Sequence, residues 1–192
     1  MPVRAAVEVT EGFINESDII GTMIKVNRAP VLTLWAAVVA ERLGFKREEA
    51  LTLGRAVAGL SAQSKGRRLG IFNPSEEKTE EARKRTRNEE FYVEIFGRSV
   101  PAVNTEGGVR ATEKGKPMQP DSVERYLTTK FSDALPEVEQ AMKELAKSYS
   151  PDELGRKAFA LYEKFRPEVP EGTKGWGAQG NLDLEQIRGL RK

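Results

Sequence analysis

Apolar residues at helical spacing predict three helices in the first third of the chain. The first covers 15–24, where a helix-start signal leads into paired apolar residues. The second covers 31–43, with Pro30 suited to its first turn and Gly44 suited to its end. The third covers 48–64 and begins with two glutamates, which the positive end of a helix dipole favours.

The middle of the chain changes character twice. Residues 71–90 are rich in charge and poor in apolar side chains, which predicts a charged linker or a solvated helix. Residues 91–117 then combine aromatic and β-branched residues with turn signals at 104–108 and 113–116. This pattern predicts one small antiparallel β-hairpin.

The last third is again helical. Asp121 and Glu124 stand at capping-box spacing before an apolar run, and Pro136 fits the start of a second helix. Ser150, followed by a proline and by an acid three residues on, predicts a third start. A short helix is predicted from about Asp183 to the end.

These elements predict a mainly α protein, a helical bundle with a small antiparallel β-hairpin, for which a winged-helix-like layout is one candidate. The composition shift suggests an N-terminal helical unit over 1–70 and a charged segment over 71–90. A second unit over 91–192 would carry the hairpin, the C-terminal helices and a glycine-rich tail that contains Trp176. The two units could share one core.

The chain of 192 residues contains neither histidine nor cysteine. Disulfides, thiolate nucleophiles, thiolate zinc sites and Ser-His-Asp catalysis are therefore excluded. Chemistry would have to rest on carboxylate, lysine, tyrosine or serine groups, or on an oxygen-ligated Mg²⁺. The net charge is only +2, from 31 basic and 29 acidic residues, so a nucleic-acid ligand would need local basic clusters.

One local pattern suggests DNA binding. Ala40 is a small residue within the second predicted helix, Gly44 follows at the turn, and Ala50 and Leu53 supply inner apolar positions of the third helix. Over about 32–56 the chain resembles the helix-turn-helix module in general. The resemblance implies a DNA-facing surface made of Lys46, Arg47, Thr52 and Arg55. A plain helical hairpin ended by a glycine accounts for the same residues.

Three further groups of basic residues are candidate phosphate contacts, because lysine and arginine on flexible loops approach a nucleic-acid backbone closely. The first group is predicted in a loop after the third helix, the second in the charged segment and the third at the hairpin tip. Neighbouring glutamates leave open that these groups are simply solvated. The residues are Lys65, Arg67, Arg68, Arg83, Lys84, Arg85, Arg87, Lys114 and Lys116.

Two other patterns have structural explanations. The residues 175–180 match G-x-G-x-x-G, but no strand precedes them and no long helix follows, so a dinucleotide site is rejected. Trp176 within this tail is instead a candidate anchor or partner-binding residue. The acidic pairs at 121–124 and 152–153 could be read as Mg²⁺ ligands, but their positions at helix starts are explained by capping.

The sequence thus favours a non-catalytic nucleic-acid-binding protein, with DNA as the preferred ligand and a homodimer as a candidate state. The alternatives are a protein-interaction or assembly module, and a small-molecule binder or enzyme using carboxylate, lysine and tyrosine groups. No cofactor or metal is expected. The longest apolar stretch, near 30–40, is too short for a membrane span, and the first residues do not resemble a signal peptide. We therefore expect a cytoplasmic protein.

Overall fold

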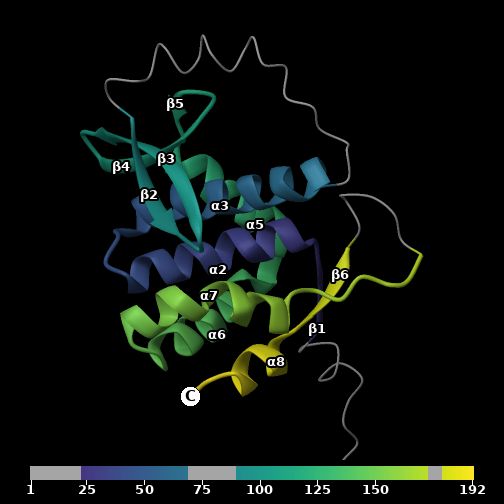
Figure 1. Cartoon of the computed structure of the whole chain (residues 1–192). Coiled ribbons are helices and arrows are strands. Elements are labelled where there is room, and N and C mark those ends of the chain that lie inside the picture. The colour runs from purple at the N-terminus through teal and green to yellow at the C-terminus, as the bar shows by residue number, and fades with distance from the viewer. Residues whose placement is uncertain (1–22, 69–89, 173–178) are drawn as a thin grey trace, which may run out of the picture.

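The computed structural model combines helices with short antiparallel strands and describes residues 23–68, 90–172 and 179–192, without the side chains of 64–68 (Figure 1). The fold is α+β, whereas the sequence favoured a mainly α bundle with one hairpin. The elements in chain order are β1 (Met23–Val26), α2 (Arg28–Arg42), α3 (Arg47–Arg68), β2 (Phe91–Ile95), β3 (Arg98–Thr105), β4 (Gly108–Glu113), β5 (Lys116–Pro117), α5 (Pro120–Phe131), the 3-10 helix η1 (Ser132–Ala134), α6 (Leu135–Lys147), α7 (Pro151–Phe165), β6 (Gly180–Asp183) and α8 (Leu184–Gly189).

Helix α2 lies at the centre of the molecule. Every residue from Pro30 to Ala40 is buried, because this almost wholly apolar run contacts α3, α5, α6 and α7. The indole Nε1–H of Trp35 donates a hydrogen bond to the backbone oxygen of Ala158 in α7 at 2.9 Å. Gly44 takes a φ of +112°, which glycine adopts without strain, and the helix ends where the sequence predicted.

Helix α3 packs against α2 well beyond the turn that joins them. A Cβ at Gly54 would lie 2.5 Å from the backbone oxygen of Thr33 and 2.8 Å from the backbone nitrogen of Ala37. The two helix backbones therefore touch at this point, as in an antiparallel helical hairpin. Helix α3 also continues to Arg68, so the prediction that 65–68 form a loop is wrong.

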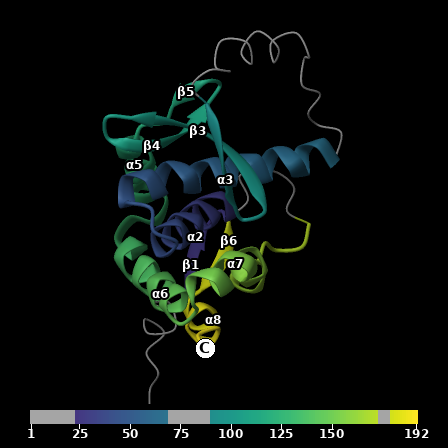
Figure 2. The same ribbon diagram turned by 60° about the vertical axis from the view of Figure 1, so that its left-hand side comes forward.

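The four-stranded sheet is a meander in the order β2-β3-β4-β5, and it lies over α3 (Figure 2). Phe96 and Gly97, with φ of 56° and 65°, form the tight turn between β2 and β3. The predicted turns at 104–108 and 113–116 join β3 to β4 and β4 to β5. The predicted hairpin is confirmed, and β2 and β5 extend it by one strand on each side.

The starts of three C-terminal helices are confirmed. Helix α6 has Pro136 in its first turn, the Ser150 side chain accepts a hydrogen bond from the Glu153 N–H at the start of α7, and Asp183 caps α8. Helix α5 differs, because it begins at Pro120 and its first residues have no side-chain cap. Asp121 therefore lies inside the first turn, and its prediction as a cap is wrong.

A two-stranded ribbon joins segments far apart in the sequence. Strand β1 pairs antiparallel with β6, from Met23 opposite Asp183 to Val26 opposite Gly180. The predicted helix over 15–24 is therefore wrong at its end, and its earlier residues lie outside the described part. The pairing partner of β1 is more than 150 residues away, so local spacing could not reveal it.

One hydrophobic core joins the two units that the composition suggested. Trp35 and Leu53, from the first unit, belong to the same buried cluster as Leu127 and Phe165, from the second. The charged segment between the units lies outside the described residues except for its last position, Glu90. Among the helices of the described ranges, none combines the length and the hydropathy that crossing a membrane requires.

Candidate functional site

The first half of α3, where the helix-turn-helix resemblance placed a DNA-reading surface, is covered by β4. The Ala111 N–H of β4 donates to the Thr52 hydroxyl oxygen at 3.1 Å, and the Val109 N–H donates to the Glu49 carboxylate at 3.1 Å. Thr52 is 0% exposed. The prediction that Thr52 faces a ligand is therefore wrong, because its hydroxyl accepts a hydrogen bond from a buried backbone N–H of β4.

The hairpin tip between β3 and β4 is fixed to the same part of α3. Arg110 has a side chain only 8% exposed, and one of its Nη atoms lies 2.8 Å from the Glu48 carboxylate. A Cβ at Gly107 would lie 2.6 Å from the Arg110 guanidinium, and one at Gly108 would lie 2.5 Å from the Glu49 carboxylate. Glycine is favoured at Gly108 by its φ of +108°, whereas a side chain at Gly107 would require the end of the flexible Arg110 side chain to move.

The charge of Glu49 supports this docking. Partial burial raises the pKa of Glu49, but hydrogen bonds from the backbone N–H groups of Val109 and Lys46 outweigh it. The pKa therefore lies below the ordinary glutamate value, because those bonds favour the ionised form. Glu49 thus holds β4 as a carboxylate and also accepts from the Lys46 N–H at 3.0 Å.

Arg47 is engaged by carboxylates from three other helices. Its guanidinium lies 2.6 Å from Glu139 of α6, 3.3 Å from Glu124 of α5 and 3.5 Å from Glu41 of α2. Burial raises the pKa of Glu139, but hydrogen bonds from Lys143 and Arg47 lower it by more. The pKa of Glu139 therefore lies below the ordinary glutamate value. Arg47 therefore joins helix ends, and phosphate contact would have to displace these partners.

Arg55 also has a partner within the fold. Its guanidinium carbon lies 4.3 Å from the centre of the Tyr126 ring of α5, a distance at which a cation is attracted to the face of an aromatic ring. Of the four residues assigned to the DNA-facing surface, only Lys46 is exposed and free of an ion pair with a described residue. The start of α3 therefore offers little free surface for DNA.

The basic groups predicted to contact phosphate are spread along α3 and beyond. Lys65, Arg67 and Arg68 belong to the last turns of α3, whose 22 residues span about 33 Å, so they lie at the opposite end from Lys46. Lys114 and Lys116 are exposed at the turn between β4 and β5. The remaining candidates lie outside the described residues, namely Arg83, Lys84, Arg85 and Arg87 of the charged segment and Trp176 of the tail.

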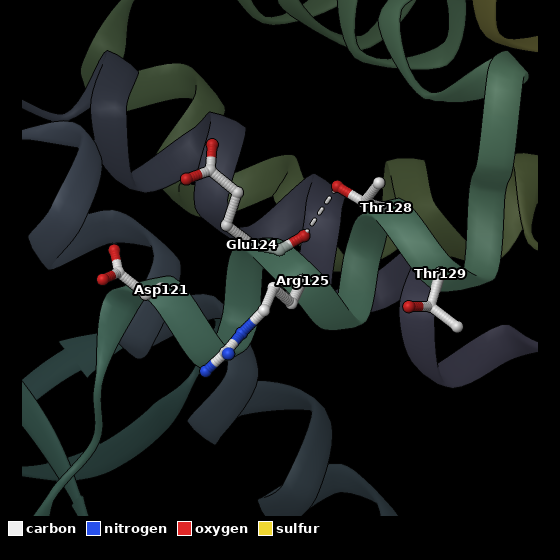
Figure 3. A pocket seen from close by; sticks show the side chains of 5 residues that line it. All are labelled: Asp121, Glu124, Arg125, Thr128 and Thr129. Atoms are coloured by element: carbon white, nitrogen blue, oxygen red, sulfur yellow. Dashed lines mark hydrogen bonds between the residues drawn. The ribbon is translucent and has the colours of Figure 1, made fainter.

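A shallow depression on the outer side of α5 offers no converging reactive groups. It is lined by residues of α5 alone, and the Thr128 hydroxyl donates to the helix's own backbone at Glu124, 2.9 Å away (Figure 3). Within the described ranges, no group of three or more acidic side chains is arranged to hold a metal ion. The lining residues are Asp121, Glu124, Arg125, Thr128 and Thr129.

Thr52→Val is expected to lower the free energy of unfolding by about 1–3 kcal/mol, because the buried Ala111 N–H loses its acceptor. Thr33→Val is the matched control. Thr33 is equally buried, but its hydroxyl only donates to the Ala29 oxygen one turn earlier in the same helix. Urea denaturation of both variants gives the comparison, and equal losses would contradict the role assigned to Thr52.

The sheet side exposes two lysines at the β4–β5 turn and one large aromatic ring, together with carboxylates such as Glu94 and Glu113. Tyr92 of β2 is 65% exposed, the highest value among the large hydrophobic residues of the described ranges. The sequence analysis predicted the lysines as contacts but did not single out Tyr92. In a strand, Tyr92 points to the face opposite that of Phe91 and Val93, and this alternation could have identified it.

Comparisons with protein-family models, with curated proteins and with solved structures found no match for this chain.

Proposed function

We propose that this protein binds nucleic acid through the side of the molecule that carries the β2–β5 sheet. The observation that carries the proposal is the turn between β4 and β5. Lys114 and Gly115 have φ of 51° and 78°, which turns the chain sharply and leaves Lys114 and Lys116 exposed. Neither lysine forms an ion pair with a described residue, so both are available to phosphate.

The opposite side of the molecule pairs several of its cations with carboxylates, although Lys147, Arg156, Lys164 and Arg166 are exposed there without an ion pair to a described residue. Figures 1 and 2 place the sheet on one side of α2 and α3, and α6, α7 and α8 on the other. On that helical side, Lys157 and Lys192 share the carboxylate of Glu153, and Arg188 and Arg191 pair with glutamates of α8 and α6. These pairs reduce the positive charge that a polyanion would meet there.

The proposal also includes basic residues that precede the sheet in the sequence. The last turns of α3 carry Lys65, Arg67 and Arg68, and the chain from there returns to the sheet at β2. The basic residues at 83–87 stand a few positions before β2 in the sequence. In this proposal, these basic residues and the β4–β5 turn bind phosphates together. The turn acts as the wing of a winged helix does. The start of α3 contacts no bases.

The test is the salt dependence of binding to a fluorescein-labelled oligonucleotide of about 15 nucleotides, followed by anisotropy. We expect affinity to fall steeply between about 50 and 200 mM salt, since bound counterions are released. Lys114→Gln combined with Lys116→Gln should reduce the slope of log K against log salt by about 1.4–1.8, the contribution of two phosphate contacts.

A matched control removes the same charge from the other side of the molecule. Lys147→Gln combined with Lys164→Gln alters two exposed lysines of α6 and α7 and should leave the slope unchanged. Equal effects of the two double variants would mean that only net charge matters. Absence of binding to single strands and duplexes at low salt would refute the function, and light scattering on the same samples would show whether the protein is a homodimer.

A further inference from the structure

We propose that the nucleic acid is bound single-stranded, with unpaired bases stacked on the outer face of the β2–β5 sheet. This inference rests on the proposed nucleic-acid function and names its ligand class. It starts from Tyr92, whose ring is the most exposed large hydrophobic side chain of the described ranges. Exposed aromatic rings on antiparallel sheets are suited to base stacking because every base has a π-face.

Strand alternation assigns Tyr92 to the face turned away from the core. Its neighbour Val93 packs against the core and stands opposite the fully buried Val100. Side chains of adjacent residues point to opposite faces of a strand. Tyr92 and Pro101, which stand opposite each other in the register, therefore both belong to the outer face.

A row of four residues crosses the sheet next to this face: Tyr92, Pro101 and Pro117 bear rings, whereas Thr112 is only 6% exposed and is hydrogen-bonded to Glu90. Tyr92 stands opposite Pro101. Ala102 stands opposite Ala111, so the next position along each strand brings Pro101 beside Thr112. Thr112 in turn stands opposite Pro117. The row Tyr92, Pro101, Thr112 and Pro117 thus crosses four strands, a distance of about 14 Å at the usual strand spacing. It leads from β2 to the turn that bears Lys114 and Lys116.

Two carboxylates border this row and decide which part of a nucleic acid can approach it. Glu90 accepts a hydrogen bond from the Thr112 hydroxyl, and Glu94 accepts one from the Ser99 hydroxyl. Both carboxylates repel phosphates from the middle of the face, whereas an unpaired base can stack on Tyr92 with its phosphates displaced toward the lysine-bearing turn. A duplex presents phosphates on its outside and keeps its bases paired, so it fits this face poorly.

The experiment compares three labelled ligands of equal length: an oligo(dT) strand, an abasic strand with the same phosphates, and a duplex. Wild-type protein should bind oligo(dT) most tightly. Tyr92→Leu should weaken oligo(dT) binding by about 5- to 150-fold, the range for one lost base stack, and leave the abasic strand unchanged. Tyr92→Phe should retain the affinity because it retains the ring.

Phe159→Leu is the control variant, since it removes an exposed ring from α7 on the helical side. It should leave all three affinities unchanged. The stacking proposal is overturned if Tyr92→Leu binds oligo(dT) as the wild type does, or if the abasic strand or the duplex binds as tightly as oligo(dT). Binding of the three ligands with equal affinity and with a lysine-dependent salt slope would leave the proposed function standing. Absence of binding to all three would refute both proposals.

Discussion

Gly54→Ala is expected to destabilise the protein by about 1–3 kcal/mol, the usual cost of overpacking a close contact. The added Cβ would lie 2.5 Å from the Thr33 oxygen and 2.8 Å from the Ala37 nitrogen. Both are backbone atoms of α2, which cannot rotate away as a flexible side chain can. The helices must therefore separate, and the core around Trp35 must loosen with them.

Gly59→Ala, on the same helix, is the matched control. A Cβ at Gly59 would have no heavy atom within 4 Å, so the substitution should stabilise the protein by up to about 1 kcal/mol through helix propensity. Urea denaturation followed by circular dichroism measures both variants. If Gly54→Ala behaved as Gly59→Ala does, the close approach of α2 and α3 would be refuted.

Trp35→Ala is expected to cost about 3–5 kcal/mol, the usual range for removing a large buried aromatic side chain. Trp35 is 0% exposed, and its ring meets the ring of Phe165 edge-on at a centroid distance of 5.4 Å. Its N–H also binds the Ala158 oxygen of α7. The side chain thus connects the two units that the composition had separated, and the loss should affect both.

Cooperativity is the readout that tests this connection. We expect one unfolding transition for the wild type and one for Trp35→Ala. For each protein, circular dichroism and tyrosine fluorescence should give the same midpoint. Trp35→Phe should cost less, because a phenyl ring refills most of the space. Two separate transitions, of which Trp35→Ala shifts only one, would contradict a shared core.

Local signals in the sequence were sufficient for many elements. Gly44 ends α2, Ser150 caps α7 and Asp183 caps α8 at the predicted positions. Each signal acts within a few residues, because a cap or a positive φ satisfies backbone groups of the adjacent turn. The turns at 104–108 and 113–116 were predicted for the same reason, whereas the turn at Phe96 and Gly97 was missed and the number of strands was underestimated.

The candidate site was much less predictable. Thr52 and Glu49 looked like surface positions on a helix, but the N–H groups of β4 bind both of them. Arg47 looked free, but three glutamates from other helices surround it. A helical sequence shows which residues share a face, but it does not show which distant strand or carboxylate covers that face.

The sequence by itself determined the end of α2, the starts of α6, α7 and α8, two of the three turns of the sheet and the absence of histidine and cysteine chemistry. These properties depend on residue type and on neighbours a few positions away. Only the tertiary structure decided that β1 pairs with β6, that β4 covers α3 and that Tyr92 and the β4–β5 lysines remain exposed. Such properties depend on contacts between residues far apart in the chain, and burial of one shared core selects among those contacts.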